Sequence, residues 1–353
     1  MTLSWPGRVL EGPAAWRGDE LAHDTTWIHT FSAEELAELE GALTRVRGLP
    51  RPVLDVTREN FVLPTLGPLL AEVKHTLLHG RGFILFRGLP AERYSLPELA
   101  TLFWGLGTWL GRAVSQNARG HVLGHVRDLG FDASHPGTRL YQTNQRQGYH
   151  TDSADLVGLL CVRGARHGGL SSLASTVTVY NELFRRRPDL ARVLFEPFHT
   201  DHRNEYRPGH KPYFSIPPLN FHEGELTGIY QRRYIESAQR FEDVPRLTPR
   251  QVEALDLFDA LLDDPGIHLE MRLEPGDMQF IHNHQILHDR TAFEDWPEPE
   301  RRRHLLRLWL CPPEGRPLPP IFAERYGSVE VGRRGGVQVP DSELKAPLEG
   351  GGV

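Results

Sequence analysis

Two His-x-Asp tripeptides, at 150–152 and 199–201, could each offer an imidazole and a carboxylate to one metal ion. In a strand, residues i and i+2 point to the same face. Chance alone gives about one such tripeptide in a chain of this composition, so the surroundings must distinguish the two. The first precedes an apolar run at 156–162, whereas the second enters a polar, loop-like stretch. Because a rigid support fixes a ligand better than a loop does, we favour His150 and Asp152.

The segment 274–288 could supply a third ligand, because it holds His282, His284 and His288. A Pro-Gly-Asp turn signal opens it, and a bend near Asn283 predicts a return strand that carries His288. Each histidine taken alone is more often a surface or hydrogen-bonded core residue. We therefore expect a metal site only if the first tripeptide and this segment converge.

Two histidines and one carboxylate on one face leave three positions of an octahedral metal open. This set suits Fe(II) oxygenases, which bind a co-substrate and O₂ together. A closed zinc site would need four protein ligands, usually including cysteine. Neither Cys161 nor Cys311 lies near such a partner in the sequence. The pattern thus favours iron.

A cation for an organic acid is the next requirement, and the segment 301–310 contains Arg303 and Arg307, four residues apart at the start of a predicted strand. An arginine that points into a barrel is costly unless it meets an anion. Its planar fork can bind a carboxylate with two hydrogen bonds. A buried ion pair or a water-facing strand edge would explain the same residues.

Composition excludes several classes of protein. The 353 residues carry a net charge of −6 and no basic domain, which argues against a nucleic-acid binder. No apolar stretch is long enough for a signal peptide or a membrane span, so we expect no membrane partner. The two cysteines form no disulfide framework, and we expect a cytoplasmic, reducing location.

Helices are signalled in the first third of the chain. Ser32 with Glu35 and Ser95 with Glu98 form capping boxes, which predict helices over 33–47 and from 96 to about 110. A further helix is expected over 66–79, and the glycine-bracketed apolar run 82–88 reads as a strand. Helical inserts are expected at about 178–195 and 249–263. Short apolar runs separated by Gly, Pro and Asp predict strands at 121–127, 155–163, 171–179, 226–230, 267–273, 277–282 and 304–310.

These elements predict a mainly β fold, a sandwich or jelly roll with flanking α-helices. We expect one domain over 1–325. It would comprise an N-terminal arm at 1–30, a flank of helices and one strand at 31–110, and a β core with helical inserts at 120–312. The Gly-rich stretch 326–353 is expected to be a flexible tail.

The motifs together resemble one enzyme family. They stand in this order: Gly82-Phe83-Ile84-Leu85-Phe86-Arg87-Gly88-Leu89-Pro90, His150-Thr151-Asp152, Gly168-Gly169-Leu170-Ser171, Leu287-His288-Asp289-Arg290 and Arg303-His304-Leu305. This series resembles the taurine dioxygenase / clavaminate synthase-like branch of Fe(II)/2-oxoglutarate-dependent oxygenases. The likeness spans about 82 to 310.

The resemblance implies a double-stranded β-helix, or jelly roll, flanked by helices. It implies that His150, Asp152 and His288 hold the iron, and that Arg303 pairs with the distal carboxylate of 2-oxoglutarate. Ser171 falls where the family carries a Thr or Ser that bonds the same carboxylate. The implied co-substrates are 2-oxoglutarate and O₂.

Four further positions are implied to meet the substrate. Arg307 matches a position that contacts an anionic substrate in some members. Tyr141, Asn144 and Tyr149 fall where members line the substrate pocket. These assignments rest on the resemblance, because buried aromatic residues are more often part of a core.

Three features depart from the family pattern. Leu170 stands where an acidic residue is common, which could alter the hydrogen bonding near Ser171. The gap from His288 to Arg303 is slightly long, so Arg301 or Arg302 could be the carboxylate binder instead. His282 and His284 are extra potential ligands close to the site.

The expected function is oxidation, most simply hydroxylation, of an unactivated C–H bond of a small organic substrate, with release of succinate and CO₂. Arg307, Arg232 and Arg233 could meet an anionic group, although we expect the latter two to be structural. Two alternatives stay open: a cupin-like metal enzyme that uses His282, His284 and His288 without 2-oxoglutarate, and a non-catalytic jelly-roll binding or sensor protein. The sequence leaves the oligomeric state open, a homo-oligomer included.

Overall fold

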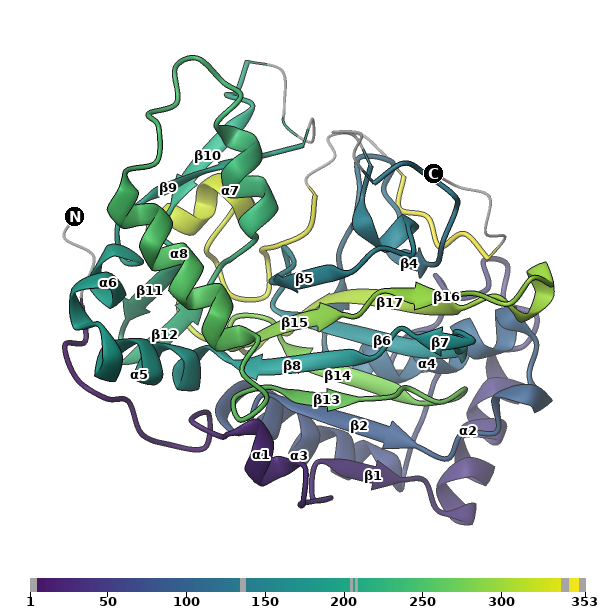
Figure 1. Cartoon of the computed structure of the whole chain (residues 1–353). Coiled ribbons are helices and arrows are strands. Elements are labelled where there is room, and N and C mark those ends of the chain that lie inside the picture. Colours follow the sequence, from purple (N-terminus) through teal and green to yellow (C-terminus); the bar gives the residue numbers. More distant parts are fainter. Residues whose placement is uncertain (1–4, 134–137, 204–205, 207–208, 338–342, 349–353) are drawn as a thin grey trace.

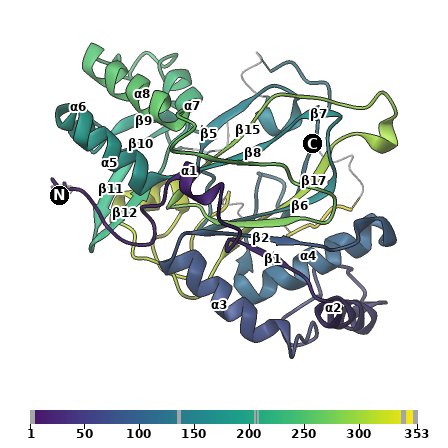
Figure 2. The same cartoon turned by 60° about the horizontal axis from the view of Figure 1, so that its bottom comes forward.

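The computed structural model describes residues 5–133, 138–203, 206, 209–337 and 343–348. Two β-sheets lie face to face, with helices against the outer side of one sheet and at one end of the molecule (Figures 1 and 2). The expected class, a mainly β protein with flanking helices, is confirmed.

The larger sheet is seven-stranded, in the order β1-β2-β14-β6-β17-β3, with β4 also paired to β17. Only β1 and β2 run parallel among these pairs. Its strands are β1 (Ile28–Thr30), β2 (Phe83–Arg87), β3 (Arg112–Ala113), β4 (Leu123–Val126), β6 (Leu156–Arg163), β14 (Met278–His282) and β17 (His304–Cys311).

The smaller sheet is four-stranded and antiparallel, in the order β13-β8-β15-β5. Its strands are β5 (Gln147–His150), β8 (Ser171–Ser175), β13 (Leu269–Met271) and β15 (Ile286–Arg290). Three two-stranded pairs complete the β structure: β7 (His167–Gly168) with β16 (Phe293–Glu294), β9 (Phe198–Asp201) with β10 (Tyr213–Ile216), and β11 (Leu219–His222) with β12 (Glu225–Gly228).

The long helices begin where the sequence predicts them. The bounds are α1 (Gly18–Leu21), α2 (Ala33–Val46), α3 (Leu66–His79), α4 (Leu96–Leu110), α5 (Thr176–Arg186), α6 (Pro188–Val193), α7 (Arg232–Ala238), α8 (Pro249–Leu262) and α9 (Ala323–Tyr326). Both predicted capping boxes form, and Thr248 makes a third with Gln251. None of the helices in the described part of the chain has the length and apolar character that a bilayer span requires.

Strand alternation gives the larger sheet two buried faces. In β14, Phe280 packs with α4 residues such as Phe103, whereas the next residue, Ile281, packs between the sheets with Leu173 of β8. The predicted strand at 171–179 is too long, because Ser175 ends β8 and its hydroxyl caps α5 by accepting from the Thr178 amide.

The expected flexible tail is wrong for residues 326–337, which pack against the segment that follows β5. Arg334 has a fully buried side chain that pairs with Asp155 at 2.9 Å. The glycines permit close approach: Gly336 has a φ of +74°, and a Cβ there would lie 2.7 Å from the Ser115 carbonyl oxygen. The Gly336 amide donates to the Ser153 carbonyl. Residues 338–342 and 349–353 of the predicted tail lie outside the described residues.

The buried Asp155–Arg334 pair makes a prediction about stability. Replacing Arg334 with alanine leaves the Asp155 carboxylate buried without its cation, and we expect a loss of about 3–5 kcal/mol in the free energy of unfolding. Urea denaturation measures this. The control is Arg333→Ala, because that side chain is 77% exposed and we expect a change below about 0.5 kcal/mol. Equal effects of the two substitutions would contradict the packed tail.

Candidate active site

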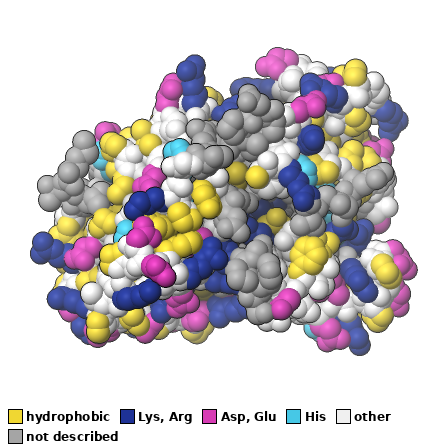
Figure 3. Space-filling model, turned by 90° about the horizontal axis from the view of Figure 1, so that it is seen from above, with side chains coloured by type: hydrophobic (Ala, Val, Ile, Leu, Met, Phe, Trp, Pro, Cys, Tyr) yellow, Lys and Arg dark blue, Asp and Glu magenta, His cyan; other side chains and the backbone are white. Residues whose placement is uncertain are grey.

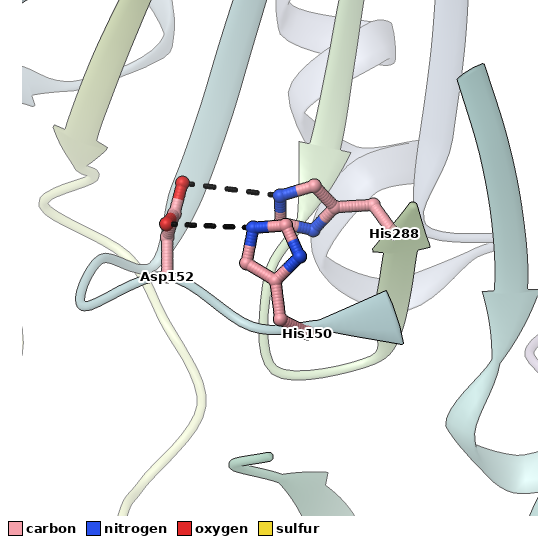
Figure 4. Close-up of side chains that lie close together, drawn as sticks. All are labelled: His150, Asp152 and His288. Atoms are coloured by element: carbon pink, nitrogen blue, oxygen red, sulfur yellow. Dashed lines mark ion pairs between the residues drawn. The ribbon is translucent and has the colours of Figure 1, made fainter. Parts of the chain in front are cut away.

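The register of the smaller sheet brings two of the predicted ligands together. His150 at the end of β5 pairs directly with His288 of β15, and their ring centroids lie 4.1 Å apart. Asp152 follows two residues later, and its carboxylate turns toward both rings (Figure 4). One ligand atom from each of the three residues lies within 4.8 Å of the others. The predicted convergence of two distant segments therefore occurs.

The three groups are spaced as ligands rather than as hydrogen-bonding partners. His150 Nε2 lies 3.9 Å from one Asp152 oxygen, and His288 Nε2 lies 3.9 Å from the other. His150 Nδ1 lies 3.0 Å from the Gly148 carbonyl oxygen, so it can donate there and leave Nε2 for a metal. The Gln147 amide now contacts this same Nε2, at 2.9 Å, and a metal would replace that contact.

The protonation states suit a cation. Burial lowers the pKa of His150, and it lowers the pKa of His288 to about 3, with the nearby His150 adding to the effect. Burial raises the pKa of Asp152, but Arg307 and the two histidines more than offset this and the net shift is downward. At neutral pH the site therefore holds two neutral imidazoles and one carboxylate, the forms that bind metal.

The larger sheet fixes the Asp152 carboxylate. In β17, Trp309 donates its indole N–H to Oδ2 at 2.8 Å, and Arg307 donates to the same oxygen at 3.3 Å. Arg307 also donates to the Gln116 side chain at 2.8 Å. With Oδ2 bonded twice, Oδ1 is the oxygen left for a metal.

The backbone around Asp152 is clamped by Asn283, which lies between β14 and β15. The Asn283 side chain accepts from the Asp152 amide at 2.7 Å and donates to the carbonyls of Asp152 and Ala154 at 2.7 and 2.8 Å. Tyr326, at the end of α9, donates to the same Asp152 carbonyl at 3.2 Å. Sequence reasoning assigned Asn283 only to a bend, because its partner lies 131 residues away.

The second His-x-Asp tripeptide forms no comparable group in the described residues. It does not enter a loop, as the sequence suggested, but lies in β9. The Asp201 carboxylate pairs with Arg240 at 3.1 Å and accepts from Ser237. These contacts give Asp201 a structural role.

His282 and His284 stand apart from the triad. His284 Nε2 lies 2.6 Å from the Asp155 carboxylate, beside Arg334. His282 Nδ1 lies 3.4 Å from the Arg316 guanidinium. Within the part of the chain that the structure describes, the group able to hold a metal contains His288 but neither of these residues. The donor set thus remains two histidines and one aspartate, as an Fe(II) oxygenase needs.

Of the three consecutive arginines, only Arg303 is buried. Arg301 covers the ring of Trp296, and Arg302 donates to the carbonyls of Trp296 and Pro297. The Nη1 atom of Arg303 has no hydrogen-bond partner, and among the described residues no carboxylate forms an ion pair with this guanidinium. Burial lowers its pKa to about 10, so it remains a cation at neutral pH.

A turn of small residues borders Arg303. Gly169 has a φ of +68°, and a Cβ there would lie 3.0 Å from Arg303 Nε. Two residues on, the Ser171 hydroxyl donates to Gln279 across the sheets at 3.2 Å. Ser171 pairs in register with Arg290 of β15.

Arg290 is a buried cation that the sequence prediction did not single out. It donates to backbone carbonyls of Leu140, Thr143 and Gln145. Burial lowers its pKa to about 9, and the neighbouring Arg303 contributes. Its place two residues after His288 could have indicated that it faces the site. It anchors the segment before β5 to the strand that carries His288.

A cavity opens beside the triad, and the predicted substrate residues differ in their relation to it. Tyr141 and Arg307 line it with His150 and Asp152, and the Arg307 guanidinium lies 4.9 Å from the Tyr141 ring centroid. The prediction missed Gln116, Gln147, Gln231, Tyr234 and Trp309, which also line it.

Asn144 and Tyr149 do not line this cavity. Asn144 is exposed, and its carbonyl accepts from the Phe293 amide. Tyr149 directly precedes His150 in β5, so it points to the opposite side and packs with the core around α5 and α8. The expectation that these two residues line the substrate pocket is wrong for this structure.

Comparison with known proteins decides the family. The sequence model described as "Taurine catabolism dioxygenase TauD, TfdA family" matches residues 45–309. The chain belongs to this family. The family prediction, and with it the prediction of an Fe(II)/2-oxoglutarate dioxygenase, is confirmed.

Two relatives in this family align over most of the chain. FR-33289 synthase of Streptomyces rubellomurinus is 32% identical over 330 residues, which are 91% of this chain and 96% of that protein. The taurine hydroxylase-like protein SAT17 of Stachybotrys chartarum is 30% identical over 322 residues, which are 86% and 82% of the two chains.

Solved structures share the fold. Asparagine oxygenase, in complex with Fe(II), 3-hydroxyasparagine and succinate, superposes with a TM-score of 0.64 at 18% identity and covers 80% of this chain and 93% of its own. The non-heme iron oxygenase OrfP, in complex with Fe and alpha-ketoglutaric acid, has a TM-score of 0.60 at 17% identity over 80% and 93% of the two chains.

The Asn283 clamp makes a prediction about metal binding. In Asn283→Ala the Asp152 backbone loses two hydrogen bonds and the Ala154 carbonyl loses one, and we expect iron affinity to fall about 10–100-fold, as for other supports of metal ligands. Iron titration with a competing chelator measures this.

The control for that experiment is Asn220→Ala, because Asn220 is also fully buried but bonds to Pro217, away from the site. We expect it to lose stability while keeping its iron affinity. If the two variants bind iron equally well, the clamp does not support the metal site.

Proposed function

We propose that the chain hydroxylates an unactivated C–H bond of a small organic substrate, using Fe(II), 2-oxoglutarate and O₂ and releasing succinate and CO₂. The observation that carries this is the convergence of His150, Asp152 and His288 at one point between the sheets. In this proposal the three residues hold the iron. The bound iron and 2-oxoglutarate supply the oxidising chemistry, and the chain supplies binding, orientation and exclusion of water.

Arg303 and Ser171 would bind the distal carboxylate of 2-oxoglutarate. Arg303 is the buried member of its arginine run, and its Nη1 atom has no partner. A buried guanidinium without an anion is costly, and a carboxylate would satisfy its planar fork. Ser171 would add a hydrogen bond to the same carboxylate: it lies two residues beyond Gly169, which borders this guanidinium, and its hydroxyl bonds to Gln279 in the structure.

The presence of the Asp152 carboxylate favours hydroxylation over halogenation. A halogenase of this type needs an open metal position for halide, usually made by a small residue in place of the carboxylate. Here Asp152 is present and held by Trp309 and Arg307. Desaturation, ring closure and dealkylation use the same ligand set.

The substrate would enter the cavity lined by Tyr141 and Arg307, beside the triad. The asparagine oxygenase structure holds hydroxyasparagine, a small polar product, and a similarly small substrate suits this chain. Arg307 already donates to Gln116 and Asp152, so it would contribute only its remaining N–H groups to an anionic substrate.

Three finer assignments accompany this proposal. The two facing sheets would form the double-stranded β-helix of the family, and residues 1–325 would be one domain that the packed segment 326–337 extends. The location would be cytoplasmic, which the buried free thiols of Cys161 and Cys311 support.

The cupin-like alternative has less support. It requires His282 and His284 to join His288, whereas these residues contact Arg316 and Asp155. The non-catalytic alternative is tested by turnover. Succinate formation that depends on both iron and 2-oxoglutarate supports hydroxylation. A metal without 2-oxoglutarate dependence supports the cupin reading, and a protein without metal supports the binding or sensor reading.

The assignment of the iron ligands is tested by substitution. We expect His150→Ala and Asp152→Ala to lose iron, because each removes one of three ligands. The control is His199→Ala, which changes the other His-x-Asp tripeptide and should retain iron. Metal analysis of the purified proteins measures the outcome. Full iron content in either of the first two variants would rule out this ligand set.

The assignment of Arg303 is tested by a matched pair of variants. In Arg303→Gln the distal carboxylate of 2-oxoglutarate loses its cation, and we expect the KM for 2-oxoglutarate to rise about 10–100-fold. The control, Arg302→Gln, removes an exposed neighbour and should leave KM unchanged. Succinate release as a function of 2-oxoglutarate concentration is the measurement. A rise in KM only in the Arg302 variant would reassign the carboxylate to that residue.

A further inference from the structure

The described lining of the cavity beside the triad is rich in arginine. Four arginines line it, Arg139, Arg233, Arg307 and Arg325, whereas the only carboxylate among its described lining residues is the iron ligand Asp152. Figure 3 shows the molecule from above, and dark blue Lys and Arg side chains lie near the middle of that face. An excess of cations around one cavity indicates an anionic ligand.

Three arginines gather around the ring of Tyr234. Arg139 donates to the Tyr234 hydroxyl at 2.5 Å and also lies 5.6 Å from the ring centroid. Arg203 lies 5.3 Å from the same centroid. Only 7% of Arg203 is exposed, and its Nε atom has no hydrogen-bond partner. Burial lowers the pKa of Arg203, and the charges of Arg233 and Arg139 add to this.

Asp201, the acid close to Arg203 in the sequence, does not pair with the Arg203 guanidinium. Asp201 pairs with Arg240 at 3.1 Å and accepts from the Ser237 hydroxyl. It meets Arg203 through the backbone amide rather than through the guanidinium. Keeping like charges together in a partly buried place costs free energy, which a bound anion would recover.

The adjacent residues Arg232 and Arg233 differ in their contacts, and this difference supports a role for Arg233 in the cavity. Arg232 is held by three carboxylates, Glu236, Asp256 and Asp259, at 2.7–3.1 Å, as expected for a structural residue. Arg233 lines the cavity and donates a hydrogen bond to the Ala133 carbonyl. The expectation that Arg233 is also merely structural does not fit this placement.

We propose that Arg139, Arg233 and Arg325 form a subsite for a phosphate-type dianion on the substrate, in the cavity that His150 and Asp152 also line. A tetrahedral phosphoryl group offers three acceptor oxygens and nearly two negative charges, so it can meet several guanidinium forks at once. A single carboxylate offers one charge and two oxygens. Tyr234 contacts both Arg139 and Arg203, and these contacts would hold the arginines of the subsite in position.

This inference rests on the proposed function, because the dianion would hold the substrate so that its carbon chain reaches the iron. It assigns the substrate class as a small organic phosphate or a compound with an equivalent dianionic group. The binding energy would come from the charged end, while oxidation occurs at the other end.

The test uses iron-loaded enzyme saturated with 2-oxoglutarate, with inorganic phosphate as the probe at about pH 8. Calorimetry at constant ionic strength measures the Kd, and acetate serves as the monoanionic comparison. We expect saturable phosphate binding that is at least tenfold tighter than acetate binding. Saturation with 2-oxoglutarate keeps the probe away from Arg303.

Matched variants locate the binding. We expect Arg233→Gln to weaken phosphate binding about tenfold or more, Arg233→Lys to weaken it less, and Arg232→Gln to leave it unchanged. Melting temperatures show whether each variant is folded. Unchanged binding in both Arg233 variants, or equal binding of acetate and phosphate, overturns the subsite. Failure of the enzyme to bind iron or 2-oxoglutarate instead overturns the proposed function, so the two failures are distinguishable.

Discussion

The antiparallel register of β5 on β15 is the constraint on which the site depends. It sets His150 directly opposite His288, so that both imidazoles leave the sheet on one face. A slip of one residue would turn one ring to the other side, where Tyr149 now packs into the core. The irregularity after His288 lets the ladder continue to Arg290, which fixes the segment before β5. The same pairing therefore aligns the ligands and anchors the chain that delivers them.

Buried charge is distributed around this pairing with a partner for nearly every cation. Arg334 meets Asp155, Arg290 meets backbone carbonyls, and Arg307 meets Gln116 and Asp152. Such groups are affordable inside a protein only when their hydrogen bonds are made. Arg303 differs because its Nη1 atom lacks any partner. Several other buried arginines leave an Nε atom without a partner, but among the described residues Arg303 is the one whose buried terminal nitrogen lacks a partner, and we therefore assign it to a ligand that arrives from outside.

Local signals predicted the parts of the molecule that local interactions determine. The capping boxes at Ser32 and Ser95 set helix starts within a few residues, and both form as expected. His150 and Asp152 were also predictable, because the apolar flank distinguishes them from the other His-x-Asp tripeptide, although Asp152 lies just beyond the strand. The choice of His288 among three histidines came from the family resemblance. The role of Asn283 was not predictable, since the residue that it contacts, Asp152, lies 131 positions away in the sequence. The prediction of a flexible tail was wrong for residues 326–337, because a glycine-rich sequence is typical both of flexible segments and of segments that pack closely against a neighbour. Only the structure shows which of the two applies.

The sheets hold the metal ligands, whereas the segments that connect the strands line much of the cavity. This separation explains how one iron site can serve different substrates. His150 and His288 lie on paired strands, and the three ligands with Asn283, Arg307 and Trp309 fall within the 45–309 stretch that the family model matches. The cationic end of the cavity instead comes from Arg233 of α7, Arg139 before β5 and Arg325 of α9, the last beyond that stretch. Strands hold a metal geometry rigidly, whereas connecting segments vary without disturbing it. Because none of these three arginines belongs to the proposed ligand set, a change in that cluster would alter which molecule is held without altering how it is oxidised.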